Sequence, residues 1–297
     1  MLFRSLLRPL ARAWGEGWRR SAGEGAEEEV GEAVVAALLG LLAVVEGGGG
    51  ARVGVDDAFR GGGGGGMTAL KQAAAGGHAL AVERLLAAGA GVDVEGGDGA
   101  APLWEAAHGG HAGVVRRLLG AGAAVDVVGG GDGSMPLYMA AEQGHADVAE
   151  VLLGSGAAVD AAAADGRTPL YVAAEKGHEA VVAVLLGSGA AVDQAKDTGV
   201  TPLFMAAQKG FDAIVGQLLA AGAAVDQARD TGATPLFMAA QNSFDAIVGQ
   251  LLAAGADASK CNNQGASPLH FPKAEGHAAV VALLVGAGAA GCVCGCC

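Results

Sequence analysis

Residues 197–229 are DTGVTPLFMAAQKGFDAIVGQLLAAGAAVDQAR, and the 27 residues that follow, DTGATPLFMAAQNSFDAIVGQLLAAGA, match the start of that stretch at 24 of 27 positions. Chance does not produce such agreement, and a fixed period of this length is the signature of a repeat architecture. The chain is therefore expected to consist largely of copies of one small structural unit.

The tripeptide Thr-Pro-Leu, or a close variant, occurs seven times at intervals of 33 or 34 residues. Its first residues are Thr68, Ala101, Met135, Thr168, Thr201, Thr234 and Ser267. With few exceptions each copy is followed by Ala-Ala, by Gly-His or Gly-Phe, by a V-V-x-x-L-L stripe and by Gly-Ala. We predict seven repeats over residues 67–290, starting near residues 67, 100, 134, 167, 200, 233 and 266.

Each repeat is predicted to hold two short helices. Thr201 can cap the first helix, and Pro202 suits its first position because proline has a preset φ and no N–H to lose. Gly210 ends that helix, and the second helix has one apolar stripe made of Ile214, Val215, Leu218 and Leu219. One such pair cannot bury its own apolar face, so stacking the pairs creates a continuous core and an all-α solenoid.

The pattern D-x-x-G-x-T-P-L-x-x-A-A-x-x-G-H-x-x-V-V-x-x-L-L-x-x-G-A resembles the ankyrin repeat over about three quarters of the chain. The resemblance implies stacked helix–turn–helix units with β-hairpin-like loops and a concave groove lined by first helices and loop tips. It also implies a non-enzymatic role in protein–protein recognition, without a cofactor. We find no P-loop, G-x-S-x-G, H-E-x-x-H or kinase signature in the sequence.

Three features depart from the ankyrin pattern. The histidine usual after T-P-L occurs only as His270, and five repeats carry an aromatic residue there: Trp104, Tyr138, Tyr171, Phe204 and Phe237. Pro272 falls inside the first helix of the seventh repeat, where it is expected to distort that helix. The third repeat has one extra glycine within residues 129–131, which should enlarge its loop.

The resemblance places partner-contacting side chains at the loop tips and after each Ala-Ala pair. The tip candidates are Arg167, Val200 and Ala233, and the groove candidates are Glu142, Gln143, Glu175, Lys176, Gln208, Lys209, Gln241 and Asn242. The tips also repeat an acidic residue, at Asp98, Asp132, Asp165, Asp197 and Asp230. These carboxylates either steer a basic partner segment toward the groove or, as we favour, cap their own turns.

Two other periodic sets allow alternative interpretations. The aromatic row can grip an apolar peptide, but at helical spacing we favour packing between repeats. The histidines His78, His111, His145, His178 and His277 recur once per repeat, too far apart to share a metal ion, so we predict a structural role. We also reject residues 286–291 as a dinucleotide motif, because they follow a predicted helix instead of a strand.

Composition limits the partner and the compartment. The formal net charge of −13 argues against nucleic acid, whose phosphates require a basic surface. The first of the five cysteines is Cys261, so no disulfide framework holds the repeats, and a reducing, cytoplasmic setting follows. We expect a monomer that binds a protein.

The two ends leave a second function open. Residues 1–20 are rich in arginine and apolar residues, as in an organelle transit peptide or a helix on a membrane surface, and a disordered tail is the alternative. Within the basic and glycine-rich residues 1–66, the apolar run 33–45 predicts a degenerate cap helix inside residues 30–45. Residues 291–297 hold four cysteines, which suit a soft metal or lipid unless the reading frame is misassigned. The alternative function is therefore a membrane-associated regulatory subunit.

Overall fold

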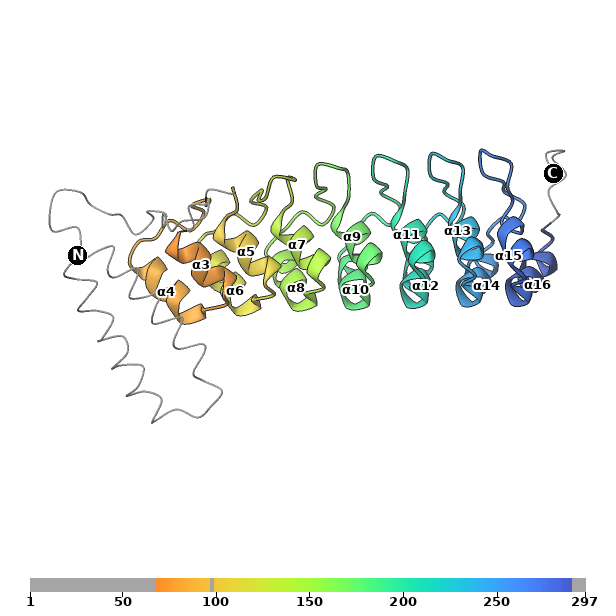
Figure 1. Cartoon of the computed structure of the whole chain (residues 1–297). Coiled ribbons are helices and arrows are strands. Elements are labelled where there is room, and N and C mark those ends of the chain that lie inside the picture. The colour runs from red at the N-terminus through yellow and green to blue at the C-terminus, as the bar shows by residue number, and fades with distance from the viewer. Residues whose placement is uncertain (1–67, 97–98, 290–297) are drawn as a thin grey trace, which may run out of the picture. The chain divides into compact units, whose positions relative to one another are not determined.

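A computed structural model describes residues 68–96 and 99–289, and divides the chain into two compact units, Met1–Ala124 and Val125–Cys297. The described residues form fourteen α-helices (Figure 1). Among these residues there is no strand, and one isolated bridge joins Gly129 to Ser134. The predicted all-α architecture is confirmed. The predicted cap helix in residues 30–45 and both chain ends lie outside the described residues.

The helices alternate between a first and a second helix of each repeat. The first unit contains α3 (Ala69–Ala75), α4 (Ala79–Ala87), α5 (Pro102–His108) and α6 (Ala112–Gly120). The second unit contains α7 (Pro136–Gln143), α8 (Ala146–Gly154), α9 (Pro169–Lys176), α10 (Glu179–Gly187), α11 (Pro202–Lys209), α12 (Asp212–Ala220), α13 (Pro235–Gln241), α14 (Asp245–Ala253), α15 (His270–Glu275) and α16 (Ala278–Gly286). Odd numbers denote first helices and even numbers denote second helices.

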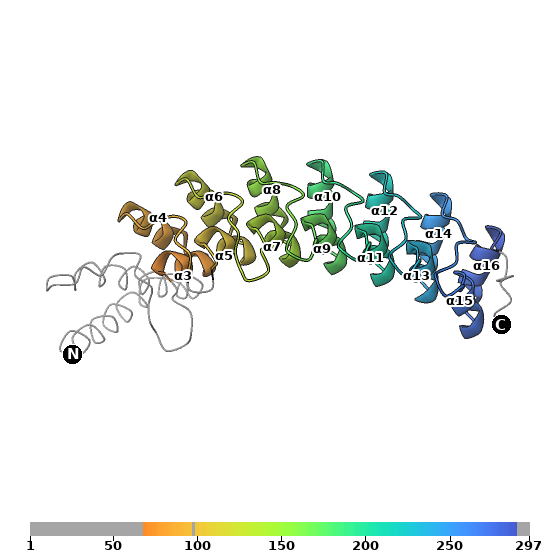
Figure 2. The ribbon, with the colours of Figure 1, turned by 90° about the horizontal axis from the view of Figure 1, so that it is seen from above.

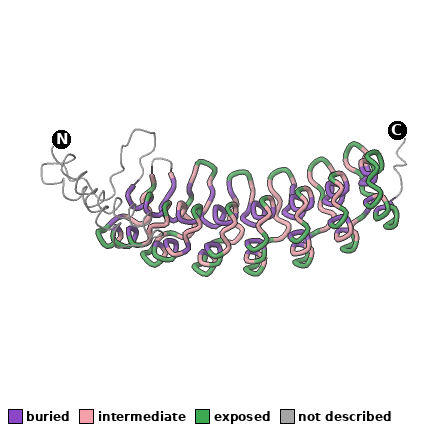
Figure 3. Tube along the Cα trace, turned by 60° about the horizontal axis from the view of Figure 1, so that its bottom comes forward, coloured by how far each residue is buried: buried purple, intermediate pink, exposed green. Residues whose placement is uncertain are grey.

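Within each unit, like helices pack on like helices. In the second unit the first helices α7, α9, α11, α13 and α15 follow one another in a row, and the second helices form a parallel row beside them (Figure 2). The alanine pairs of the first helices, such as Ala206 and Ala207, are completely buried, which lets neighbouring helices approach closely. The buried residues lie mainly in the helices, whereas the tips of the loops are exposed (Figure 3).

The first helices begin as the sequence predicts. The Oγ1 atoms of Thr168, Thr201 and Thr234 accept hydrogen bonds of 3.1, 3.1 and 3.2 Å from the backbone N–H three residues later. Each of these threonines is buried and is followed by proline at the first helical position. The cap therefore satisfies an N–H that has no partner inside the helix.

A second row of hydrogen bonds joins neighbouring repeats from the first to the sixth. The carboxylate of Asp193 accepts bonds of 2.9 and 3.1 Å from the backbone N–H of Ala224, 31 residues later. The same bond recurs in the second unit from Ala158 to Asp126, Ala191 to Asp160 and Asp257 to Asp226, and in the first unit from Ala124 to Asp93. These aspartates follow the second helices, and the sequence analysis assigned them no contact between repeats.

Rings from one repeat cover the glycine that ends the first helix of the previous repeat. Nε2 of His178 donates a 2.9 Å hydrogen bond to the carbonyl oxygen of Glu142, and a Cβ added to Gly144 would lie only 2.6 Å from this ring. Phe211 occupies the equivalent place over Gly177. In the first unit His111 bonds the oxygen of Ala75 at 3.0 Å. The predicted structural role is confirmed for His111 and His178.

Both local irregularities predicted from the sequence are present. In the third repeat the N–H of Gly129 bonds the oxygen of Ser134 at 2.8 Å, five residues on, whereas the matching bond from Lys196 to Val200 spans four. The extra glycine therefore lengthens this loop by one residue. In the seventh repeat α15 has six residues and no side-chain cap, and Pro272, which lies inside it, has no N–H to bond the preceding turn.

Ser243 is strained in a way that the sequence analysis missed. It is the one non-glycine residue with positive φ (60°) in the described part of the chain, and it stands where α7, α9 and α11 end at a glycine with φ 85°. Its Oγ is buried without a hydrogen-bond partner. A left-handed serine and an unsatisfied hydroxyl each cost on the order of 1 kcal/mol.

We predict that Ser243→Gly raises the free energy of unfolding by about 1 kcal/mol, because glycine accepts this φ and removes the buried hydroxyl. Ser188→Gly is the matched control, since Ser188 has φ −94° and its Oγ bonds the oxygen of Val184 at 2.9 Å. The control is expected to be neutral or less stable. Urea unfolding of both variants measures the difference, and equal changes at the two sites would contradict the assignment of strain.

Candidate protein-binding surface

The predicted groove residues lie together at one end of the first helices of the second unit. They form four pairs, each at the last turn or C-cap of a first helix: Glu142–Gln143, Glu175–Lys176, Gln208–Lys209 and Gln241–Asn242. In each pair the first residue is half-buried and the second is exposed. We call these four pairs, together with the loops 163–167, 196–200 and 229–233, the first-helix face.

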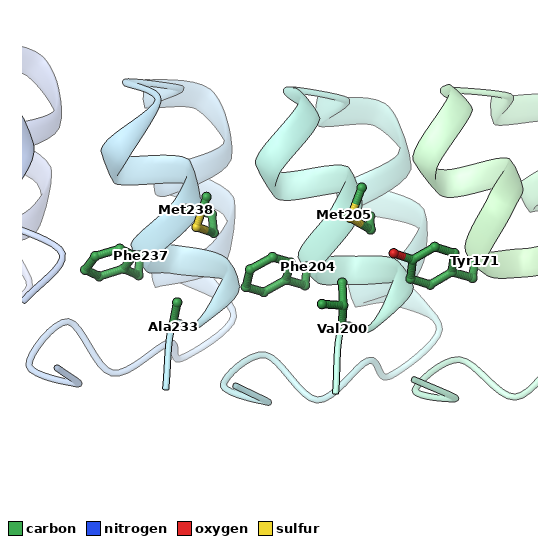
Figure 4. Packing of buried hydrophobic residues seen from close by; sticks show 7 residues of the cluster. All are labelled: Tyr171, Val200, Phe204, Met205, Ala233, Phe237 and Met238. Carbon is green, nitrogen blue, oxygen red and sulfur yellow. The ribbon is translucent and has the colours of Figure 1, made fainter. Parts of the chain in front are cut away.

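Two of the predicted tip residues are not available to a partner. Val200 and Ala233 are only 6% and 3% exposed and belong to the apolar cluster between repeats. Val200 lies beside the ring of Tyr171, and Ala233 lies beside the ring of Phe204 (Figure 4). This burial argues against the predicted contact of these two side chains with a partner. The signal was present in the sequence, because this position is apolar in three successive repeats.

The aromatic row packs between repeats, as we favoured. Tyr138, Tyr171, Phe204 and Phe237 are each at most 4% exposed, so they cannot form a ladder for an incoming peptide. Each of the three rings drawn in Figure 4 extends from its own first helix toward the next repeat. In the first unit Trp104 is half-buried and stacks on His108, with 5.6 Å between the ring centroids.

Cations from the loops lie over three of these rings. Arg167 stands 5.8 Å from the ring centre of Tyr138, Lys196 stands 5.9 Å from Tyr171, and Arg229 stands 5.6 Å from Phe204. In each case the loop before a first helix supplies the cation to the ring of the preceding repeat. Contacts of this kind are worth about 0.5–1 kcal/mol when partly exposed, and they hold the charged groups above the row of rings.

Arg167, a predicted tip residue, already has carboxylate partners. Its guanidinium bonds Asp165 at 2.6 Å and Glu175 at 3.4 Å. Burial alone would raise the pKa of Asp165, but hydrogen bonds from the backbone and side chain of Arg167 outweigh it and lower that pKa. Lys176 has a looser pairing, 3.9 Å from Glu142.

Two of the loop-tip aspartates cap their own turns. Asp132 accepts a 3.1 Å bond from the N–H of Ser134, and Asp165 accepts a 3.2 Å bond from that of Arg167. The favoured turn role is confirmed at these two residues. Asp98 lies outside the described residues. The steering of a basic partner stays untested.

The two tyrosines sit in an environment that disfavours their ionised form. Burial raises the pKa of Tyr138 to about 12, although the charge of Arg167 opposes this shift. Burial raises the pKa of Tyr171 further still, and Glu175 adds to the effect. The hydroxyl of Tyr138 is also buried without a hydrogen-bond partner, whereas the fifth and sixth repeats carry Phe204 and Phe237 at this position.

We predict that alkaline titration unfolds the second unit as the phenols ionise. Because their folded pKa lies above the ordinary 10.0, the stability linked to these groups is complete below pH 10 and is lost as pH rises toward about 12. The chain has two tyrosines, so phenolate absorbance followed together with helicity reports on them alone. Tyr138→Phe should keep the fold and leave one titrating group. Phenolate at pH 10 with full helicity would contradict the burial.

Residues 68–96 and 99–289 contain neither a metal-binding cluster nor a membrane-spanning helix. Within these ranges no three His, Cys, Asp or Glu side chains are grouped closely enough to hold a metal ion. None of the helices found there is long and apolar enough to cross a membrane. Cys261, in the loop before α15, is exposed and forms no disulfide with the described residues.

The helices are paired and stacked in rows, and threonines cap several of the first helices. Rings packed on glycines and aspartate hydrogen bonds join the repeats at a constant period, which defines a helical repeat protein. A family model described as ankyrin repeats (3 copies) matches residues 70–163, 105–196, 137–229 and 203–293. The chain belongs to the ankyrin-repeat family, as its repeat pattern indicated.

Solved structures agree with this assignment. The ankyrin repeat domain of human ASB11 is 31% identical, with a TM-score of 0.67, over 75% of this chain and 98% of that one. The ankyrin repeat domain of Bcl-3, described as a unique member of the IkappaB protein family, is 28% identical, with a TM-score of 0.65, over 73% of this chain and 97% of that one. A search of curated protein sequences found no match.

Proposed function

We propose that this protein is a non-enzymatic scaffold or adaptor that binds a segment of a partner polypeptide on the first-helix face of its second unit. Ankyrin repeats generally mediate protein–protein interaction. The observation that carries the proposal is the row of four last-turn pairs, whose second members are exposed while the rings beneath them are buried. Binding groups on this face can vary without disturbing the core.

The spacing of the pairs suits an extended peptide. Neighbouring first helices lie on the order of 10 Å apart, and an extended chain advances about 3.3 Å per residue. Every third residue of a bound segment would then meet one pair. Gln208, Gln241 and Asn242 offer amide groups that both donate and accept hydrogen bonds, so they can pair with a peptide backbone.

The expected basic partner depends on tip carboxylates, and two of these already accept bonds from their own turns. The sign of the partner's charge therefore depends on all the charged groups of the first-helix face. We place the function in the cytoplasm, where a reducing environment would keep the exposed thiol of Cys261 reduced. We expect the binding form to be a monomer.

We predict that combining Lys176→Ala, Gln208→Ala and Lys209→Ala weakens partner binding by about tenfold or more, because the three side chains lie on adjacent first helices. Affinity capture with the full chain and mass spectrometry identifies the partner, and titration with purified partner measures the change.

The matched control is Glu179→Ala, Asp212→Ala and Asp245→Ala, three exposed acidic residues on the second helices. Helicity and melting should be unchanged in both sets. If the control set loses binding and the first set retains it, the partner lies on the second helices and the proposal fails.

The membrane-associated regulatory subunit remains the second candidate, and one described feature favours it. Helix α16 carries no charged residue, and its Leu283 and Val285 are 38% and 55% exposed. An apolar surface near a cysteine-rich end suits peripheral attachment to lipid.

Fractionation tests this alternative. If the protein is a membrane-associated subunit, the full-length protein should sediment with membranes. Deleting residues 1–20 and 292–297 should then move it to the soluble fraction. Leu283→Ser with Val285→Ser tests the contribution of α16 separately. Full-length protein found wholly in the soluble fraction would remove this candidate.

A further inference from the structure

The charged side chains of the second unit are segregated between its two rows of helices. Every lysine and arginine among residues 125–289 lies in a loop or a first helix: Arg167, Lys176, Lys196, Lys209, Arg229, Lys260 and Lys273. The charged residues of the second helices are all acidic: Asp147, Glu150, Glu179, Asp212 and Asp245. Five of these seven cations belong to the first-helix face, and Lys260 and Lys273 lie outside it.

These cations are not all neutralised by the protein itself. Arg167, Lys176 and Lys260 have carboxylates at 2.6, 3.9 and 3.6 Å. No carboxylate of the described residues lies within ion-pair distance of Lys196, Lys209 or Arg229. The one side-chain hydrogen bond of Arg229 is to a neutral group, Oγ1 of Thr231, at 2.7 Å. We call Lys196, Lys209 and Arg229 the unpaired cations.

The first residue of the last-turn pair changes along the repeats. Where α7 and α9 carry Glu142 and Glu175, which pair with Lys176 and Arg167, the equivalent residues of α11 and α13 are Gln208 and Gln241. The internal acid is therefore present in the third and fourth repeats and replaced by an amide in the fifth and sixth. Lys209 matches Lys176, but Glu175, which matches the partner Glu142, is already paired with Arg167. Lys196 and Arg229 match Ala163, so these two loop cations have no counterpart in the fourth repeat.

The carboxylates of the loop-tip residues Asp197 and Asp230 point toward the preceding loop tip and not toward the first helices. Oδ1 of Asp197 lies 2.8 Å from where a Cβ on Gly166 would stand, and Oδ1 of Asp230 lies 3.0 Å from the equivalent point on Gly199. Each carboxylate therefore lies against the preceding tip. The cations Lys196 and Arg229 lie instead over rings of the first helices.

The rings set the spacing of the unpaired cations. Lys196 is held over Tyr171 of α9, and Arg229 over Phe204 of α11, one helix spacing or about 10 Å further along the row. Lys209 is five residues beyond Phe204 on the same helix, which is a rise of about 8 Å. Carboxylates three residues apart on an extended chain are about 10 Å apart, which matches the spacing of Lys196 and Arg229.

Building on the function proposed above, we propose that the segment bound by the first-helix face is acidic, and that Lys196, Lys209 and Arg229 receive its carboxylates. The two glutamines beside them complete the site by hydrogen bonding to its backbone. A long nucleic acid is disfavoured because its continuous phosphate charge would also meet Asp197, Asp230 and a body of net charge −13.

The test uses full-length protein and three labelled peptides of about ten residues, long enough to span three repeats. One has glutamate at every third position, the second has glutamine there and the third has lysine. A single-stranded DNA oligonucleotide is the fourth probe. Fluorescence anisotropy should show the glutamate peptide binding about tenfold or more tightly than the others, with affinity falling as salt rises from about 0.05 to about 0.3 M.

Two variants of equal net charge localise the effect. Lys196→Gln, Lys209→Gln and Arg229→Gln together remove three positive charges, and Ala180→Glu, Ala213→Glu and Ala246→Glu together add three negative charges on exposed positions of the second helices. The first variant should lose the preference for glutamate, and the second should keep most of it. Melting curves of both should match that of the unmodified protein within a few degrees.

The outcomes separate the two proposals. Preferential binding of the lysine or glutamine peptide, of the oligonucleotide, or equal loss in both variants overturns the acidic-partner inference. If the glutamine or lysine peptide binds and competes with the captured partner, the binding function stands without that inference. If no peptide binds and alanine substitutions on the first-helix face leave capture of the partner unchanged, the proposed function fails as well.

Discussion

The packing of each aromatic ring onto the following repeat is the interaction on which the second unit depends. A pair of short helices buries too little apolar surface to be stable alone, so it must pack against the neighbouring repeat. Tyr171, Phe204 and Phe237 supply much of that surface, and Val200 and Ala233 close the space beside the first two rings. The loops then add a cation above each of three rings, which ties the loop to the preceding helix.

This packing determines which side chains remain for binding. The side chains after T-P-L, from Tyr138 to Phe237, are buried between repeats. Val200 and Ala233, which precede T-P-L in the fifth and sixth repeats, are buried in the same apolar cluster, so neither set is available to a partner. What remains is the last turn of each first helix and the charged end of each loop. Along the row these groups change from acid–base pairs at Glu142 and Glu175 to amides and unpaired cations at Gln208 and Lys209. The architecture is periodic, but the chemistry offered to a partner is not.

The fold could be predicted almost completely from the sequence because its determinants are local and repeated. Thr201, Pro202 and Gly210 specify helix ends by their own backbone chemistry, and the period gives the stacking. The errors arose where the outcome depends on a neighbouring repeat. Val200 is buried because a ring from the previous repeat covers it, Asp193 bonds an N–H 31 residues away, and Ser243 is strained because its position requires a left-handed residue. The eight last-turn residues follow the Ala-Ala pairs and lie at the ends of the first helices, but partner choice is set by no local rule.

A double-mutant cycle on the free energy of unfolding tests the central role of ring packing most directly. Tyr171→Leu and Val200→Ala alter side chains that lie together across a repeat boundary, whereas Tyr171→Leu and Phe237→Leu alter rings two repeats apart. The packing described here predicts a coupling energy of about 0.5–1 kcal/mol for the first pair and less than about 0.5 kcal/mol for the second. Additive effects in the first pair, or equal coupling in both, would contradict it.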